Sequence, residues 1–303
     1  SVFTLPADGC RDDARRFVER YDGLLWDAAA NEGGSCSKHV LHGGPTPHQS
    51  LKHLVPWMAG RAGERFVVAG GTDVLGRELA RVARSTLARI GIKPVGVATD
   101  VDGAVRLAAQ ADVVLSTRSG AAAVELMRAH RAAGIKAIIA SPTLGEIEVA
   151  AAGRDAIGHV AAQPYFASWI SPANWRFLDR MRRRHGARVT PSASAEAIWT
   201  QIALFGTALS HLSDTDVHPL NIREAVKGVR VEAPQGLVEL EAESLHARLW
   251  PKIAVVEPSG RLGIVARARQ AVRPLPYWAH ANRACTDDGA VTARNNVLAR
   301  DSE

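Results

Sequence analysis

Polar residues gather in three short segments that each follow an apolar, β-branched run. These segments are Gly70-Gly-Thr-Asp-Val-Leu-Gly76, Ser116-Thr-Arg-Ser119 and Ser141-Pro-Thr143. Ligands of open α/β sheets bind at the carboxyl ends of the strands. We therefore expect the three segments to line a binding cleft, although any one of them could serve only to begin a helix.

The first of these segments has the position of a phosphate-binding loop but not its sequence. It matches neither GxGxxG nor GxxxxGK(S/T), and no lysine ends it. We interpret it as a tight turn between a strand and a helix. Thr72, Asp73 and Leu75 are candidates for contacting a ligand at this turn.

The spacing of the reactive residues predicts no catalytic or metal site. His42-Gly-Gly44 resembles part of an oxyanion loop, but the chain has no GxSxG nucleophile elbow. The histidines form no HxxxH or HExxH pair, as a zinc site on a helix would need. Glu146 and Glu148 stand near a helix start, where acidic residues favour the helix dipole. We expect no catalytic residues, no metal and no cofactor.

The polar segments are positioned by alternating strands and helices between about residues 65 and 160. The runs at 65–70, 94–98, 111–116 and 136–140 are short, mainly apolar and β-branched, without the alternation of a half-buried strand. In the stretch 74–90 the apolar residues recur three or four apart, as on one face of a helix. Buried strands that are each followed by a helix predict a doubly wound parallel sheet.

The bulk composition is that of an ordinary globular protein. The chain has 303 residues, of which 47% are hydrophobic and 22% charged, which is enough for two compact lobes. No apolar run approaches the ~18 residues of a membrane span. The net charge of +6 comes mainly from arginines, which we assign to solvated helix faces and not to DNA binding.

The cysteines and the first residues of the chain indicate in which cellular compartment the protein is located. The chain has three widely separated cysteines, Cys10, Cys36 and Cys285. An odd and sparse set argues against a disulfide framework, and residues 1–9 show no signal-peptide pattern. Both observations predict a cytoplasmic location.

Several short segments, spread from about residue 15 to residue 280 and so over nearly the whole chain, resemble those of a known family in their order and spacing. They are Val18-Glu-Arg-Tyr-Asp-Gly-Leu-Leu25, Gly43-Gly-Pro-Thr-Pro-His-Gln49, Gly63-Glu-Arg-Phe-Val-Val68, Ala111-Asp-Val-Val-Leu-Ser-Thr117, Glu146-Ile-Glu-Val149, Pro164-Tyr-Phe166, Ala233-Pro-Gln-Gly236, His246-Ala-Arg-Leu249 and Arg273-Pro-Leu-Pro-Tyr277. As a set they resemble the amide-sensing regulators of bacterial amidase and nitrile-hydratase genes. Those regulators are relatives of the binding proteins of urea and short-chain amide transporters.

This resemblance implies an α/β protein with the two-lobe type I periplasmic-binding-protein fold. Residues 1–44 and 167–230 would form the first lobe, and residues 45–166 and 234–280 the second. The chain would cross between the lobes near Gly43-Gly44, after Phe166 and near 233–236. It begins near the family's third strand, so we expect a first lobe that is shortened at its N-terminus and is either completed by a homodimer mate or another partner, or poorly stable. Residues 284–303 are polar and patternless, and we expect a disordered tail.

The resemblance also implies a function and a set of ligand contacts. A small amide would bind between the lobes and shift the balance between open and closed forms. The protein would then act on an antitermination or transcription regulator protein, without chemistry of its own. The positions of the family's ligand contacts, and the polar side chains near the expected cleft, are Asp8, Ala29, Asp73, Leu75, Thr117, Ser119 and Thr143. Ala29, Asp73 and Leu75 stand where the family has other groups, including tyrosine hydroxyls that can hydrogen-bond an amide.

Two alternatives remain open at this point. The chain could be the solute-binding component of an amide, urea or branched-chain amino acid ABC transporter. It could also be a degenerate relative that acts as an interaction protein without any ligand. A signal peptide encoded upstream of Ser1 would favour the transporter.

Overall fold

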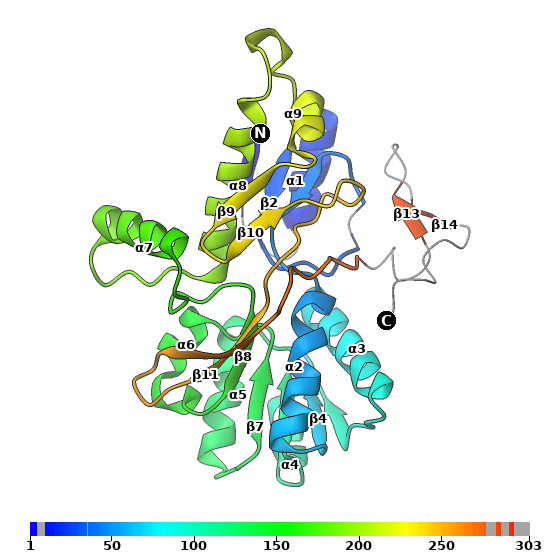
Figure 1. The fold of residues 1–303 in the computed structure, drawn as a ribbon. Helices are drawn as coiled ribbons and strands as arrows, with labels where there is room; N and C mark the ends of the chain where they lie inside the picture. The colour runs from blue at the N-terminus through cyan, green and yellow to red at the C-terminus, as the bar shows by residue number, and fades with distance from the viewer. Residues whose placement is uncertain (5–9, 35, 277–282, 286–290, 294–303) are drawn as a thin grey trace.

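The computed structural model describes residues 1–4, 10–34, 36–276, 283–285 and 291–293. It has a smaller and a larger lobe, one above the other in Figure 1, with the chain passing several times between them. Each lobe has its own sheet and its own apolar core.

The smaller lobe is built on a parallel sheet with the strand order β1-β2-β3. Its strands are β1 (Val2–Thr4), β2 (Leu25–Asp27) and β3 (Val40–His42). The lobe also contains α1 (Cys10–Arg20), α8 (Ala193–Leu209), α9 (Pro219–Val226) and the hairpin of β9 (Arg230–Ala233) and β10 (Gly236–Glu239). Trp26 and Leu41 of the sheet pack with Leu204 of α8 and Val226 of α9. The burial of these side chains holds α8 and α9 on the sheet.

The larger lobe is built on a seven-stranded sheet with the order β12-β11-β8-β7-β6-β4-β5. Its strands are β4 (Phe66–Ala69), β5 (Gly96–Ala98), β6 (Val113–Ser116), β7 (Ile138–Ser141), β8 (Val160–Gln163), β11 (Lys252–Val256) and β12 (Leu262–Arg267). The strands from β5 to β8 pair in parallel, and β11 and β12 add antiparallel neighbours. The predicted doubly wound sheet is therefore confirmed, with an antiparallel edge.

Helices cover both faces of this sheet, as the continuously apolar strands require. They are α2 (Pro47–Ala62), α3 (Val74–Arg89), α4 (Val101–Ala108), α5 (Gly120–Ala132) and α6 (Glu146–Ala152). Leu54 of α2 and Leu87 of α3 belong to one core cluster, whereas Ala104 of α4, Val124 of α5 and Val149 of α6 belong to another. Strand β4 contributes to both clusters, with Val68 in one and Ala69 in the other. Successive side chains of a strand point to opposite faces, which explains the split.

The remaining elements are short or lie outside the two sheets. They are α7 (Pro172–His185), the 3₁₀ turns η1 (Gly153–Ala156) and η2 (Asp214–Asp216), and the paired strands β13 (Arg283–Cys285) and β14 (Val291–Ala293). Helix α7 projects to one side between the lobes in Figure 1. Most of the tail expected to be disordered lies outside the described residues, and β13 and β14 pair within its described part.

The structure differs from the expected division of the chain at residues 234–249. We assigned them to the second lobe, but β10 pairs with β9, and Val238 and Leu249 join the core cluster of Trp26 in the smaller lobe. The chain enters the larger sheet only at β11. A hairpin buries its apolar face with the strand it is paired to, so β10 cannot leave β9 for the other lobe.

The cysteines also differ from expectation. Cys36 is disulfide-bonded, whereas Cys10 is a free and exposed cysteine. The chain contains one further cysteine, Cys285. The odd number and wide spacing of the cysteines predict no disulfide framework, but separation along the sequence does not determine the distance between two cysteines in the folded chain.

A buried ammonium group joins the segments that run between the lobes. The Nζ atom of Lys252 donates to the carbonyl oxygens of Pro164 at 2.7 Å, Gln235 at 2.9 Å and Trp250 at 3.0 Å. Lys252 is 1% exposed. Burial lowers its pKa to about 7, against the opposing charge of Glu196. Three backbone acceptors from separate segments are thus satisfied by one side chain.

Glu196 on α8 completes this buried group of charges. Its Oε1 accepts from Thr200 Oγ1 at 2.8 Å, and its Oε2 accepts from Gln235 Nε2 at 2.9 Å. Burial raises the pKa of Glu196 to about 7, although Thr200, Lys252 and Gln235 oppose the shift. Gln235 therefore contacts both charged groups and links α8 of the smaller lobe to β11 of the larger one.

A buried histidine in the larger lobe predicts sensitivity to acid. His159 is 8% exposed, and its Nδ1 accepts a hydrogen bond from the backbone N–H of Ile139 at 3.3 Å. Burial, together with His130 and Arg131, lowers the pKa of His159 to about 3. Between that value and the pKa of ~6.5 in the unfolded chain, only the unfolded state binds the proton. Stability therefore falls as the pH drops below ~6.5.

We expect His159→Asn to reduce this acid sensitivity, because asparagine keeps an acceptor near the position of Nδ1 but does not titrate. Between pH 7.5 and pH 5, wild type should lose about 1–2 kcal/mol more unfolding free energy than the variant. Urea denaturation at both pH values measures the difference. His211→Asn, at an exposed position, serves as the control and should behave as wild type. Equal losses in wild type and His159→Asn would show that His159 is not responsible.

Candidate ligand-binding site

The predicted polar segments do meet at one edge of the larger sheet. β7, β6 and β4 are neighbours and run parallel, so the segments that follow them leave the sheet on the same side. Thr143 joins two of the segments directly, because its hydroxyl donates to the backbone carbonyl of Arg118. The sequence therefore placed these segments together correctly.

Thr117 holds this edge together through both of its hydrogen-bonding functions. Its Oγ1 accepts from the N–H of Gly71 at 3.0 Å and donates to the carbonyl of Gly76 at 2.8 Å. The residue is 0% exposed. In this structure Thr117 fixes the turn between β4 and α3, and its side chain has no surface for a ligand.

Asp73 and Leu75 also have structural contacts. The Oδ1 atom of Asp73 accepts from the N–H of Gly76 at 2.6 Å and caps α3. Leu75 is partly buried against the core cluster of α2 and α3. These contacts explain why a carboxylate and an alkyl side chain occur here, whatever else the two residues do.

The other candidate residues differ in their accessibility. Ser119 is exposed and does not cap α5 with its side chain. Thr143 is partly exposed, and its hydroxyl also contacts Ser141 Oγ at 2.9 Å. Ala29 follows β2 in the smaller lobe and is partly exposed, while Asp8 lies outside the described residues. Ligand binding by any of these residues stays a prediction.

Arg118, which was not among the site residues predicted from the sequence, stabilises the same edge of the sheet. It is 8% exposed, and its Nη1 donates to the carbonyl of Thr99 at 2.7 Å and that of Gly70 at 3.4 Å. Arg118 therefore ties the segments after β4 and β5 to the end of β6. A buried guanidinium with several carbonyl partners is a rigid support for the surrounding turns.

A second group of charges lies at the strand ends of the smaller lobe. Asp27 is 0% exposed, and its Oδ2 lies 2.9 Å from Arg11 Nε and 3.6 Å from His42 Nδ1. Burial opposes ionisation of Asp27, but His42 and Arg11 outweigh it and lower the pKa of this carboxyl. His42 in turn stacks on His246, with ring centroids 4.1 Å apart.

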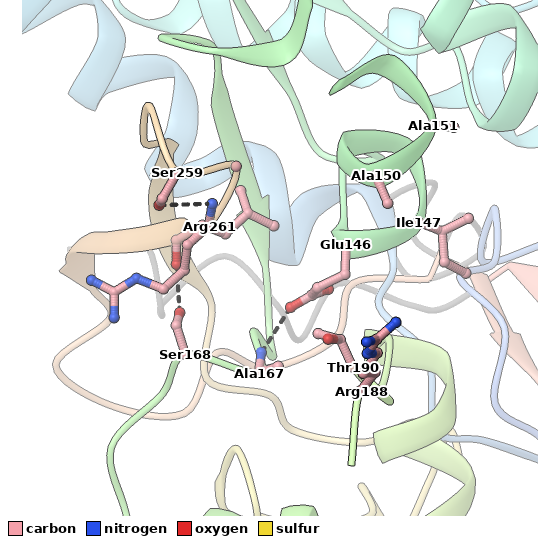
Figure 2. Close-up of a pocket in the computed structure, with 12 residues that line it drawn as sticks. Glu146, Ile147, Ala150, Ala151, Ala167, Ser168, Arg188, Thr190, Ser259 and Arg261 are labelled. Carbon is pink, nitrogen blue, oxygen red and sulfur yellow. Dashed lines mark hydrogen bonds between the residues drawn. The ribbon is translucent and has the colours of Figure 1, made fainter. Parts of the chain in front are cut away.

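A pocket of about 750 Å³ opens between the two lobes (Figure 2). Four separate segments form its wall: helix α6, the segment after β8, the connection from α7 to α8, and the turn between β11 and β12. The lining residues are Glu146, Ile147, Ala150, Ala151, Ala167, Ser168, Arg188, Thr190, Ser259, Gly260, Arg261 and Leu262. Arg188 and Thr190 precede α8 of the smaller lobe, so both lobes contribute to the pocket.

Glu146 is the most unusual group in this pocket. Its Oε1 accepts from the backbone N–H of Ala167 at 2.7 Å, while its Oε2 is buried and has no hydrogen-bond partner. Burial raises the pKa of Glu146 to about 7, against the hydrogen bond from Ala167. Its neighbour Glu148 caps α6 by accepting from the N–H of Gly145 at 3.1 Å. The helix-start interpretation is confirmed for Glu148 by this contact, whereas Glu146 reaches across to the segment after β8.

The described residues provide no support for a metal site or for a membrane-spanning helix. No group of three or more His, Cys, Asp and Glu side chains among those residues could hold a metal ion. None of the described helices has both the length and the apolar character to cross a bilayer.

The sequence as a whole matches a known family. A family model described as a periplasmic binding protein domain covers residues 4–283. The chain belongs to this family. Periplasmic binding protein domains are ligand-binding modules, which agrees with a pocket between two lobes. The fold class predicted from the sequence is thereby confirmed.

Solved structures similar to this chain include ligand-binding proteins, several of them from ABC transporters. The leucine-, isoleucine-, valine-, threonine- and alanine-binding protein of Brucella ovis, in a closed conformation, has a TM-score of 0.76 and 19% identity, with 94% of this chain and 78% of that chain covered. An ABC transporter solute-binding protein of R. palustris in complex with benzoate has a TM-score of 0.77 and 14% identity, covering 90% and 79%. A branched-chain amino acid ABC transporter periplasmic ligand-binding protein of Burkholderia xenovorans has a TM-score of 0.73 and 15% identity, covering 87% and 74%.

Proposed function

We propose that this chain is a solute-binding protein that takes up a small organic molecule between its lobes and presents it to an ABC-type importer. The observation that carries the proposal is the pocket of about 750 Å³, whose wall combines residues of both lobes with the segment after β8. A ligand that contacts both lobes favours their closed arrangement, because only there are both sets of contacts made. The similar proteins of known structure include solute-binding proteins of such importers.

The disulfide supports a location outside the cytoplasm. Disulfides persist in oxidising compartments such as the periplasm and are rare in reducing ones. Cys36 is disulfide-bonded, so the reducing compartment inferred from the cysteine spacing loses its main support. Non-reducing peptide mapping of protein from fractionated cells tests this: Cys36 should be oxidised and the protein extracytoplasmic. A reduced Cys36 in a cytoplasmic fraction would favour the regulator described next.

A cytoplasmic sensor of short-chain amides that regulates amidase or nitrile-hydratase genes is the second candidate. The ordered segments shared with the amide-sensing regulators favour it, because they extend over nearly the whole chain. This candidate requires a regulator protein as partner and has no enzymatic activity of its own. It predicts that an amide, and not an amino acid or an organic acid, stabilises the protein.

A thermal-shift titration distinguishes the candidates. The purified protein is titrated with leucine, valine, benzoate, 4-hydroxybenzoate, acetamide and urea. A ligand that binds only the folded state stabilises it by RT ln(1 + [L]/Kd), which is about 2.7 kcal/mol at ~100 Kd. We expect a saturable shift with an amino acid or an organic acid. A shift with acetamide alone would favour the sensor, and no shift with any compound would leave an interaction protein without a ligand.

A further inference from the structure

Helix α7 carries a concentration of positive charge on its solvent side. All of its arginines are exposed, and they are Arg176, Arg180, Arg182, Arg183 and Arg184. The single acidic side chain of this helix, Asp179, forms an ion pair with Arg183. The other four arginines have no ion pair with any residue that the structure describes. The surface of α7 is therefore strongly cationic.

The opposite side of α7 holds the helix against the rest of the protein. Phe177 and Leu178 are buried, and the ring of Phe177 has its centroid 6.0 Å from that of Tyr165 and 5.2 Å from that of Trp199. This packing directs the remaining side of the helix to solvent, where α7 projects from the molecule (Figure 1). A helix that projects in this way can lie along a flat surface.

Two large apolar side chains are exposed at the start of the same helix. Ile170 is 72% exposed and Trp175 is 58% exposed. They stand just before the N-cap Ser171 and four residues after it, positions that are neighbours where a helix begins. This arrangement explains why both residues are apolar, but it leaves most of their surface in water. Trp175 also lies on the same side of α7 as Arg182 and Arg183, which follow two turns later.

We propose that α7 binds peripherally to the surface of an anionic phospholipid bilayer, with its arginines on lipid phosphates and with Trp175 and Ile170 at the level of the headgroups. Arginine pairs with phosphate through two parallel hydrogen bonds, and tryptophan is enriched where proteins meet the membrane–water interface. None of these side chains lines the pocket between the lobes. The binding surface on α7 is thus independent of the function proposed for that pocket.

A nucleic acid is the other partner whose phosphates suit a row of arginines. Single-stranded nucleic acids bind where free aromatic rings among the cations stack on the bases. The ring of Trp199, which is partly buried, is covered by Arg180, whose Cζ lies 5.5 Å from the ring centroid. The exposed apolar groups are instead an indole beside an aliphatic side chain, which suits the boundary between headgroups and acyl chains. These groups therefore favour the bilayer.

Co-sedimentation of the intact protein with phospholipid vesicles tests the proposal. Vesicles of phosphatidylcholine alone are compared with vesicles that also contain about 30% phosphatidylglycerol, at ~0.05 M and ~0.5 M salt. Wild type should bind the anionic vesicles at least about tenfold more strongly than the neutral ones at the lower salt. The higher salt should remove most of this difference, because it screens the charges.

Variants of α7 identify the side chains that bind. Arg176→Gln/Arg182→Gln/Arg184→Gln removes arginines without a described ion pair and should weaken binding to anionic vesicles by about tenfold or more, since each cation near the charged surface contributes. Anionic vesicles should also shift the tryptophan fluorescence of wild type to shorter wavelength. Trp175→Phe should lack this shift, because the indole that enters the interface is then absent.

A matched control removes the same charge from another helix. Arg77→Gln/Arg84→Gln/Arg89→Gln changes exposed positions of α3 in the larger lobe and should alter vesicle binding by less than about twofold. Cooperative thermal unfolding of every variant shows that a loss of binding is not a loss of the fold.

Three results would overturn the proposal. The first is that wild type does not bind anionic vesicles at the lower salt. The second is that the α7 and α3 variants bind equally, which would show that only the overall charge matters. The third concerns a fluorescently labelled oligonucleotide: if it binds wild type more tightly than the anionic vesicles do, and only the α7 variant loses it, the surface of α7 is a nucleic-acid site.

Discussion

Replacing Lys252 with methionine is expected to lower the free energy of unfolding by about 3 kcal/mol, because several buried acceptors lose their donor at once. The ammonium group satisfies the carbonyl oxygens of Pro164, Gln235 and Trp250. Its charge also opposes the rise of the pKa of the buried Glu196. Methionine has a similar length but no donor, so the packing changes little while the hydrogen bonds are lost.

Urea denaturation at pH 7 measures this loss, and two further variants show what causes it. Lys93→Met, at an exposed position, should stay within about 0.5 kcal/mol of wild type. The double variant Lys252→Met/Glu196→Gln removes both charges and should recover part of the loss, since the unpaired carboxylate is then absent. If Lys252→Met alone unfolds at the same urea concentration as wild type, the hydrogen bonds of Lys252 do not hold the crossing segments together.

Gly44→Ala is expected to destabilise the protein by about 3 kcal/mol or more, through a backbone clash. A Cβ atom on Gly44 would lie 1.9 Å from the carbonyl oxygen of Ala29. The contacting atoms cannot easily separate, because Asn31 N–H donates to the carbonyl of Pro45 at 3.1 Å and holds the same two segments together. The clash would therefore push the segment after β3 away from the segment after β2.

Gly60→Ala is the matched control for this variant. Gly60 lies inside α2, and a Cβ atom there would meet nothing within 4 Å. Alanine is the better helix former, so this variant should be more stable than wild type by about 0.5–1 kcal/mol. Thermal and urea denaturation of both variants give the comparison. Equal stability of Gly44→Ala and wild type would show that the two segments separate at no cost.

The strands and helices of the larger lobe could be predicted in detail because each has a hydrophobic pattern within its own short segment of sequence. Its parallel strands are continuously apolar, and the helices between them repeat apolar residues every three or four positions. The polar segments after β4, β6 and β7 could be placed at one edge for the same reason. The alternation of strand and helix determines on which side of the sheet each segment leaves.

The roles of individual residues at that edge could not be predicted in the same way. Thr117 was a candidate ligand contact, yet its hydroxyl joins Gly71 to Gly76 and is buried. A threonine after a strand has the same sequence signal whether it faces a cleft or a neighbouring turn. Only the distances between segments distinguish the two cases.

The sequence by itself determined the fold class, the apolar core of the larger lobe and the relation to periplasmic binding proteins, because hydrophobic periodicity and ordered segments are properties of the linear chain. The tertiary structure decided the position of residues 234–249, the disulfide of Cys36 and the burial of Lys252. It also decided which side chains meet in the pocket, where Glu146, Arg188 and Arg261 come from segments far apart in the chain. These features depend on contacts between distant segments, and no local pattern of residue types encodes the distance between two such segments.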